Sequence, residues 1–439
     1  MDERAARELE AKTKRQRWRI ALLLGFGVLI NYFDRVNLSV SHEALRHDFG
    51  ITDVTFGYLL GAYNWTYAML QVPVGSILDR FGVRLVGCIG TFLWSAASFA
   101  GAAAPGIRTL FGSRLLLGVG EAPTFPANAK AIGVWFPPEE RSFATSLFDA
   151  AAKFASAIGV PLFGVVLLQL GWRMSFVATG VLSLLYFFAF LLLYRDPVGK
   201  ERWSHESAQS KQESTPESKD AVGDDEAEMS LLELLRQPKM IGLAIGFGSY
   251  NYVFYLLLTW LPSYLSESLH IDLLHSFLYT GVPWLAATFT DLLIGGILVD
   301  RLIQRGWNAS HTRMAVLVGG TAFGLGILGT AWSHSAVQAL TWITISIAGL
   351  SAAAPVGWSI PSLIAPPRSV GRVGGILNLS NQISGIAAPI VTGYLVYLRH
   401  SFTAAFAVAG GYLVLGICAY LFLLRDVSRM DAGRLSEAG

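Results

Sequence analysis

Twelve apolar segments, each long enough to cross a lipid bilayer, decide what this chain can fold into. A helix of about 20 residues spans the hydrocarbon core, and helices satisfy their own backbone hydrogen bonds there. The 439-residue chain is 53% hydrophobic and only 15% charged, which is too apolar for a soluble protein. We therefore predict an all-α membrane protein with twelve transmembrane helices. The expected spans are 18–40, 54–77, 84–104, 107–136, 141–169, 173–194, 240–266, 275–299, 314–333, 337–364, 371–397 and 401–424.

A polar segment divides these spans into two groups of six. Residues 196–238 are rich in Ser, Glu, Lys and Gln and poor in aromatic residues, a composition typical of a flexible linker. The predicted organisation is an N-terminal tail (1–17), a six-helix bundle (18–195), the linker (196–238), a second six-helix bundle (239–424) and a C-terminal tail (425–439).

The distribution of positive charge predicts the orientation. Segments expected on the same side as the N-terminus hold 25 Lys and Arg residues, whereas the opposite loops hold four. Positively charged loops remain in the cytoplasm, so both termini are expected there. The net charge of +2 gives no indication of a nucleic-acid partner. The sequence shows no phosphate-binding loop, metal-spaced histidines or nucleophile motif, so we expect no enzyme activity, no metal and no cofactor.

The two halves share a short motif. Gly75 is followed by Asp79 and Arg80 after the second span, and Gly296 is followed by Asp300 and Arg301 at the same offsets after the eighth. Internal repeats of this kind are typical of transporters that hold substrate between two bundles near the middle of the membrane.

These motifs resemble a known family. The stretch GSILDRFGVR from Gly75 to Arg84 resembles the cytoplasmic loop motif of the major facilitator superfamily. Asn31–Leu38 and Arg114–Pro123 resemble the anion:cation symporters within it, which include bacterial galactonate, hexuronate and glucarate transporters and the animal sialic acid and vesicular glutamate carriers. The resemblance covers all twelve spans. It implies two pseudo-symmetric six-helix bundles in a bacterial inner membrane.

Charged residues inside the spans are the first candidates for function. Asp34 and Arg35 lie well within the first span, where an unpaired charge costs about 3 kcal/mol or more. Arg114 and Glu121 are two turns apart on the fourth span. The resemblance implies that Asp34 and Glu121 carry the proton, that Arg35 holds a substrate carboxylate and that Arg114 pairs internally. The alternative is a set of structural ion pairs between helices.

The fifth span adds Asp149 and Lys153, which are four residues apart and so share a helix face. Many members of the family lack this pair. We expect Lys153 to be a second cation facing the far end of the ligand, which suits a dicarboxylic sugar acid, and Asp149 to take part in coupling. A local ion pair is the alternative. Asp291, in the eighth span, is expected to gate or to pair helices.

Uncharged polar and aromatic residues complete the candidate set. Tyr32 and Tyr67 match tyrosines that line the family's pocket. Amide, hydroxyl and aromatic groups in the second half suit the hydroxyls of a sugar acid, although helix-to-helix hydrogen bonding is an equal alternative. These second-half candidates are Tyr250, Asn251, Trp358, Ser359, Asn378 and Gln382. The motif residues expected to control gating are Gly75, Asp79, Arg80, Arg84, Asp300 and Arg301.

The charges predict a mechanism. The three acids Asp34, Glu121 and Asp149 balance the three bases, so an entering anion leaves excess negative charge that protonation of a carboxylate relieves. We predict a proton-coupled symporter that imports an organic anion, favouring a sugar acid (aldonate, hexuronate or aldarate), by rocker-switch alternating access. It is expected to function as a monomer in the bilayer. The alternatives are a transporter of another small carboxylate, such as an aromatic or tartrate-like acid, an anion exchanger or a membrane sensor.

Overall fold

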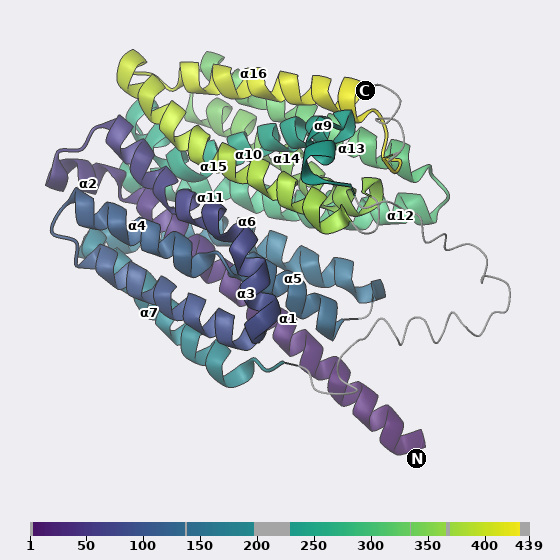
Figure 1. Cartoon of the computed structure of the whole chain (residues 1–439). Helices are drawn as coiled ribbons and strands as arrows, with labels where there is room; N and C mark the ends of the chain where they lie inside the picture. Colours follow the sequence, from purple (N-terminus) through teal and green to yellow (C-terminus); the bar gives the residue numbers. More distant parts are fainter. Residues whose placement is uncertain (1–2, 137, 197–228, 334, 366–368, 431–439) are drawn as a thin grey trace.

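The computed structural model describes residues 3–136, 138–196, 229–333, 335–365 and 369–430. Within these ranges the chain is helical and contains no strand. Two helical bundles lie side by side (Figure 1). The first contains α1 (Glu3–Val40), α2 (His42–Phe49), α3 (Asp53–Ala102), α4 (Ile107–Glu121), α5 (Thr124–Trp135), α6 (Pro138–Leu170) and α7 (Trp172–Leu193). The second contains α9 (Leu231–Arg236), α10 (Pro238–Ser263), α11 (Leu273–Thr290), α12 (Val299–Gln304), α13 (Ala309–Gly324), α14 (Ala336–Ile364), α15 (Val370–Arg399) and α16 (Thr403–Ala419).

The helices match the twelve predicted spans. In the described part of the chain, nine helices are long and apolar enough to cross a membrane. The remaining three spans are less apolar or interrupted. The fourth span is divided into α4 and α5, while the first part of α3 and the whole of α15 carry the amides Asn64, Gln71, Asn378 and Asn381. These three spans are recognisable as apolar segments of the sequence although they fall short of that stricter length and hydropathy threshold.

Spans two and three form one long element, α3, which is broken at Gly82. This residue has φ +78° and ψ 166°, a conformation that only glycine adopts without strain. A side chain at this position would also come within 3.3 Å of Asp196 Oδ2. The predicted loop between these spans is thus a sharp corner, and Gly82 belongs to the motif that begins at Gly75.

The eighth span is not one regular helix. The α11 helix passes into a π-helical segment, η3 (Asp291–Leu298), and then into α12. The motif repeat from Gly296 to Arg301 is therefore helical and does not form a loop. Two further π-helical segments, η2 (Tyr264–Ser268) and η6 (Tyr420–Leu424), end the seventh and twelfth spans, and a 3₁₀ segment, η4 (Leu325–Trp332), ends the ninth.

The segments outside the spans are more ordered than predicted. Residues 3–17 were expected to be a polar tail, but they extend α1 as a helix that projects beyond the bundle (Figure 1). Most of the predicted linker lies outside the described residues. Its last part forms α9, which is closed by a reciprocal capping box between Ser230 and Glu233, and Leu234 is buried. The end of the linker thus packs onto the second half.

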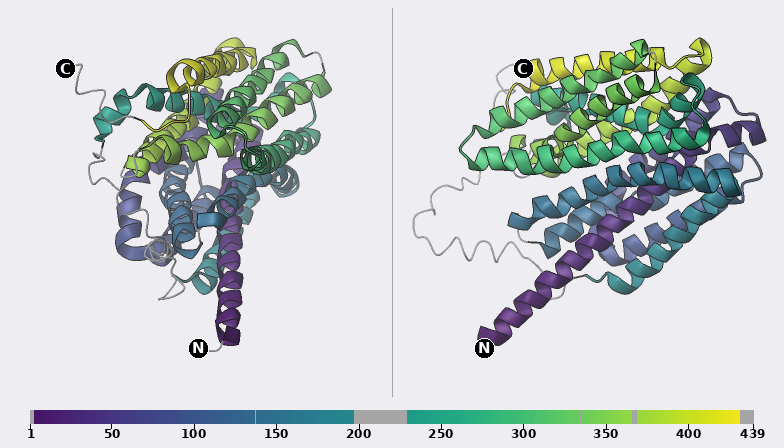
Figure 2. Two further views of the ribbon diagram at one scale, coloured as in Figure 1. Left: turned by 90° about the vertical axis from the view of Figure 1, so that its right-hand side faces the viewer. Right: turned by 180° about the vertical axis from the view of Figure 1, so that it is seen from behind.

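The two halves meet along polar contacts between α3 and α15 and around α2. Asn64 Nδ2 donates to the Gly385 carbonyl at 2.9 Å, and Asn378 Nδ2 donates to Gln71 Oε1 at 2.9 Å. At the end of the molecule away from both termini (Figure 2), the hydroxyl of Ser39 donates to the Thr259 carbonyl at 2.6 Å. The α2 end is therefore closed by direct bonds between the halves.

A glycine fixes how closely α4 approaches α3. A Cβ atom on Gly118 would overlap the Tyr63 carbonyl oxygen and Thr66 Oγ1, whereas nothing lies within 4 Å of the equivalent position on Gly112 in the same helix. We predict that Gly118→Ala destabilises the protein by about 1–3 kcal/mol through overpacking, while Gly112→Ala does not. Thermal unfolding in detergent measures both. An unchanged melting temperature for Gly118→Ala would show that the two helices can separate without cost.

Candidate functional site

A buried ion pair joins the first and fourth spans. Arg35 Nε and Nη2 both donate to Glu121 Oε2, at 3.2 and 3.1 Å. Glu121 is 0% exposed. Its second oxygen, Oε1, has no hydrogen-bond partner among the described residues. The sequence assigns Arg35 and Glu121 separate roles, but in the structure the two side chains form one ion pair. Only one of the two Glu121 oxygens takes part in it.

Tyrosines surround the Arg35 guanidinium. Its carbon lies 4.5 Å from the ring centre of Tyr32, 4.6 Å from that of Tyr63 and 5.8 Å from that of Tyr67. Such cation–π contacts stabilise a desolvated cation by about 2 kcal/mol or more. Tyr63 was not predicted from sequence. Its hydroxyl lies 3.2 Å from that of Tyr255, so the tyrosine cluster extends from one half to the other.

Asp34 is held by neutral donors. Trp94 Nε1 and Ser98 Oγ donate to its carboxylate, the latter at 2.6 Å, and Ser183 Oγ donates at 3.1 Å. Arg114 Nη1 donates at 3.2 Å to the backbone carbonyl of Asp34. Asp34 and Glu121 therefore have different surroundings, since only Glu121 forms an ion pair with Arg35.

Lys153 links the two halves. Its Nζ donates to Asp149 Oδ2 at 2.7 Å and also to Asp291 Oδ2. Sequence reasoning considered Asp149 and Lys153 together but did not place Asp291 with them. The buried set then holds four acids and three bases, which gives a formal charge of 3 − 4 = −1 when all are ionised. The net charge of zero expected from the sequence therefore becomes −1 once Asp291 is included.

The Arg35 and Lys153 clusters are neighbours. The Tyr32 phenol lies within electrostatic range of Arg35 and also of Asp149 and Lys153. Tyr250 lies within range of Lys153, its two carboxylates and Tyr32. The predicted residues Tyr32 and Tyr250 are thus brought together with both cations.

The other candidate residues of the second half differ in their hydrogen-bond partners and in their exposure. Asn251 Nδ2 donates to Asn381 Oδ1 at 2.7 Å, and Gln382 Oε1 has no partner among the described residues. Asn378 is used in the contact with Gln71. Trp358 is 43% exposed and contacts Phe247, whose ring stacks on Tyr250. The Ser359 hydroxyl donates to Val356 O in its own helix.

The gating-motif residues lie far from these clusters in the fold, at the end of the molecule that carries the termini. The Arg80, Arg84, Asp300 and Arg301 side chains are exposed. Arg84 Nη2 donates to the Leu191 carbonyl at 3.4 Å. Gly75 is half-buried, and the side chain of Asp79 lies outside the described part of the chain.

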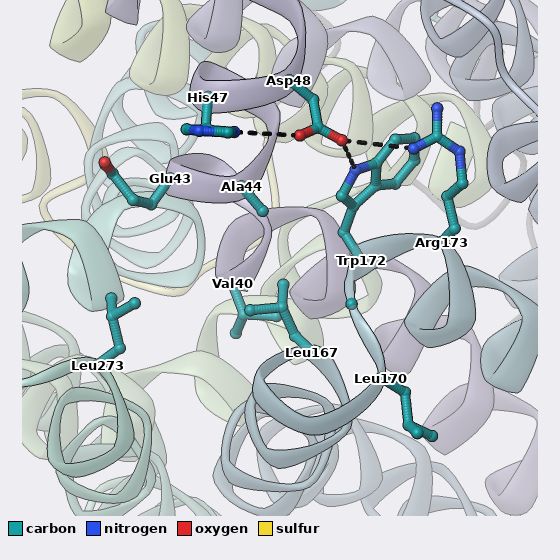
Figure 3. A pocket seen from close by; sticks show the side chains of 11 residues that line it. Val40, Glu43, Ala44, His47, Asp48, Leu167, Leu170, Trp172, Arg173 and Leu273 are labelled. Atoms are coloured by element: carbon teal, nitrogen blue, oxygen red, sulfur yellow. Dashed lines mark hydrogen bonds and ion pairs between the residues drawn. The ribbon is translucent and has the colours of Figure 1, made fainter.

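A pocket of about 560 Å³ opens at the α2 end, beside α2 and the α6–α7 turn (Figure 3). Asp48 at its edge accepts hydrogen bonds from Trp172 Nε1 at 2.7 Å and from Arg173 at 3.4 Å. These bonds lower the pKa of Asp48 below its usual value, the Trp172 bond most. Within the pocket Asp48 contacts both His47 and Arg173, and the predicted site residues do not line it.

Nine membrane-length apolar helices in the described part of the chain, together with the buried Lys153–Asp291 ion pair between the halves, define a multi-pass membrane protein. The family model described as Major Facilitator Superfamily matches residues 24–389. The chain therefore belongs to this family, and it is a transporter and not an enzyme, as predicted.

Relatives of known name cover nearly the whole chain. It is 39% identical over 415 residues to the "Uncharacterized transporter YybO" of Bacillus subtilis, covering 94% of this chain and 95% of the relative. It is 29% identical to the D-galactonate transporter of Escherichia coli, covering 96% and 98%. The crystal structure of a bacterial homolog to the human lysosomal transporter Spinster, in an inward-facing and occupied conformation, superposes with a TM-score of 0.73 at 17% identity, covering 93% and 97%. This last likeness shows the shared fold.

A third charged cluster, which the sequence did not predict, closes the α2 end. The buried ring of His42 stacks on Phe56 and meets Trp260 edge-on. Its Nε2 lies 3.4 Å from Asp53 Oδ1, and its Nδ1 lies 3.4 Å from Glu267 Oε1 in the other half. The Nδ1 atom also lies within hydrogen-bonding distance, 3.0 Å, of the Ser263 hydroxyl. Burial disfavours the imidazolium, but the two nearby carboxylates outweigh it and raise the pKa of His42 above its ordinary value.

Closure at the α2 end should consequently depend on pH. The protonated ring stabilises the contact fully below about pH 6.5, and this stabilisation is lost as the pH rises through the raised pKa of His42. Arg46 also contacts Glu267, at 3.4 Å. Spin labels at the exposed positions His47 and Leu274, one in each half, measure the separation in a chain without its two cysteines.

The matched control is His42→Gln, which cannot be protonated. We predict that the distance between the labels lengthens with rising pH in the parent and stays constant in His42→Gln. The same pH dependence in both proteins would assign the titration to a group other than His42.

Proposed function

We propose that this chain is a proton-coupled symporter that imports an organic anion, a sugar acid, by rocker-switch alternating access. It would work as a monomer in the bacterial inner membrane with both termini in the cytoplasm. The observation that carries the proposal is the buried contact between Arg35 and Glu121. It places a cation suited to carboxylates beside a carboxylate that a proton can neutralise.

The proposed step is an exchange of partners on Arg35. A substrate carboxylate would take the place of Glu121, which would leave a charged glutamate without a partner in an apolar site. Protonation of Glu121 removes that penalty, because burial disfavours the charged form. Anion and proton would then bind together, which is the requirement for symport. Asp34 would hold the first span in place through its bonds to Trp94, Ser98 and Ser183, and Arg114 through its bond to the Asp34 carbonyl.

The alternating motion has support from the contacts between halves. The bonds at the α2 end, among them Ser39 to Thr259 and Arg46 to Glu267, close that face. Positive charge predicts that this face is extracytoplasmic. Import would require a second state in which these bonds are broken and the site opens to the extracytoplasmic side.

The name of the D-galactonate transporter supports a sugar acid as substrate. The three tyrosine side chains that surround Arg35 would also suit the flat face of an aromatic carboxylate. Aromatic carboxylates should therefore be tested as substrates beside the sugar acids.

The direct test uses liposomes that hold the protein and a pH-sensitive dye. Aldonates, hexuronates, aldarates and aromatic acids are added outside, one at a time. Acidification of the lumen by sugar acids alone supports the proposal. Acidification by aromatic acids alone would show that the substrate is an aromatic acid and not a sugar acid. If no added acid acidifies the lumen and the protein is folded, proton symport is contradicted.

Loss of Arg35 should abolish binding. We predict that Arg35→Ala weakens sugar-acid affinity at least about 30-fold, the effect of removing one partner of a buried charge pair, whereas Arg108→Ala, at an exposed position, has no effect. Isothermal titration of the purified proteins measures both.

Arg35→Ala leaves Glu121 buried without a cation, so it can fail to fold. The double variant Arg35→Ala with Glu121→Gln removes both charges and keeps the test available. Sugar-acid affinity in the double variant equal to that of the parent would remove Arg35 from the binding site.

A further inference from the structure

The ion cluster around Lys153 is a place where the two halves are joined by charge. Lys153 lies on α6 of the first half, and Asp291 lies at the junction of α11 and η3 in the second. Their side chains form an ion pair and are 1% and 0% exposed. Separation of the halves at this level therefore requires this ion pair to break.

The cluster contains two carboxylates, Asp149 and Asp291, but only one cation, Lys153. Asp149, one turn before Lys153, keeps a 2.7 Å contact with the ammonium group and is 26% exposed. Asp291 uses one oxygen for Lys153, and its Oδ1 is buried without a hydrogen-bond partner among the described residues. An unsatisfied buried acceptor costs about 1–3 kcal/mol or more. Burial disfavours the charged form of Asp291, so a proton on Asp291 would relieve the cost of its leaving Lys153.

The backbone at Asp291 is also irregular. The π-helical segment η3 starts at this residue, and π-helical turns inside helices are frequent at functional sites. Gly295, in the same segment, lies against the Ala352 carbonyl and Pro355 of α14. The segment is thus packed on a second helix while its first residue bonds across the halves.

Tyr32 connects this cluster with Arg35. Its ring centre is 4.5 Å from the Arg35 guanidinium, and its hydroxyl feels the charges of Asp149 and Lys153. A ligand whose carboxylate is bound by Arg35 would therefore extend past Tyr32 toward Lys153. The two cations are each neutralised by a carboxylate of the protein, Glu121 at one end and Asp291 at the other.

We propose that Asp291 occupies the place of a second carboxylate of the substrate, and that the preferred substrate is a dicarboxylic sugar acid. This inference rests on the proposed function and narrows its substrate class. The second carboxylate of the ligand would bind Lys153 in place of Asp291. The displaced Asp291, which faces Lys153 and Asp149 from α6 and Tyr250 from α10, would be neutralised by a proton.

The exchange gives a dicarboxylate a second effect. A monocarboxylate bound at Arg35 leaves the Lys153–Asp291 ion pair intact, so the halves remain joined there. A dicarboxylate breaks that ion pair when it binds. The same step that selects the dianion therefore also removes a bond that opposes movement of the halves.

The test compares galactarate with galactonate, which have the same carbon chain and differ in one terminal group. Isothermal titration measures the affinity of each for the parent, Lys153→Gln and Asp291→Asn. We expect Lys153→Gln to weaken galactarate about tenfold more than galactonate, since it removes one charge contact. Asp291→Asn removes the competing carboxylate and should strengthen galactarate about tenfold more than galactonate.

The matched control is Glu267→Gln, which weakens another ionic contact between the halves, with Arg46 and His42, and does not touch Lys153. It should leave the ratio of the two affinities unchanged. Lys153→Gln leaves two carboxylates without a cation. The double variant Lys153→Gln with Asp291→Asn therefore serves if the single variant does not fold, and it should show the same loss of preference for galactarate.

The outcomes separate the two levels of the argument. If both sugar acids bind but the variants change both affinities equally, the cluster is a structural tie and this inference is overturned while the proposed function stands. If Asp291→Asn weakens galactarate more than galactonate, Asp291 assists the ligand and the displacement is wrong. If the parent binds neither acid, the proposed function fails and this inference fails with it.

Discussion

The cost of burying charge in a membrane governs this structure. Arg35 lies at hydrocarbon depth and is tolerated because Glu121 bonds two of its nitrogens and three tyrosine rings surround it. Helix α4 must then approach α3 closely, which is why Gly118 lies at their contact. The arrangement stabilises a charge that can change its partner, and this capacity is what transport of an anion requires.

The contacts between the halves also reflect the free-energy cost of burying polar groups in a membrane. The less apolar helices α3 and α15 face one another, so their amides bond across the halves and not to lipid. Lys153 bonds to Asp291 at the level of the buried charges, and the His42 cluster closes the α2 end. Each of these bonds is polar and lies at an interface between rigid bundles. Such contacts can be exchanged for bonds with a ligand or a proton without disturbing the apolar packing within each bundle.

The sequence was sufficient to predict the spans, since hydropathy depends on composition along the chain. It also singled out Asp34, Arg35, Glu121 and Lys153, because charge in an apolar span is visible without a structure. It could not identify Trp94, Ser98 or Asp291 as partners, because these lie 60, 64 and 138 residues from the groups they bond. The sequence predicts a polar tail at residues 1–17 and leaves open whether it is helical, because its composition suits either; in the structure α1 already begins at Glu3.

The central claim is that an anion and Glu121 compete for Arg35, and that a proton on Glu121 decides the competition. The most direct measurement is the pH dependence of sugar-acid affinity in the parent and in Glu121→Gln, by isothermal titration. In the parent, affinity should fall as the pH rises, because the anion must displace a charged glutamate. In Glu121→Gln, which is permanently neutral, affinity should stay high and vary little with pH. An equally steep pH dependence in the variant would place the coupling proton on another group and contradict the account.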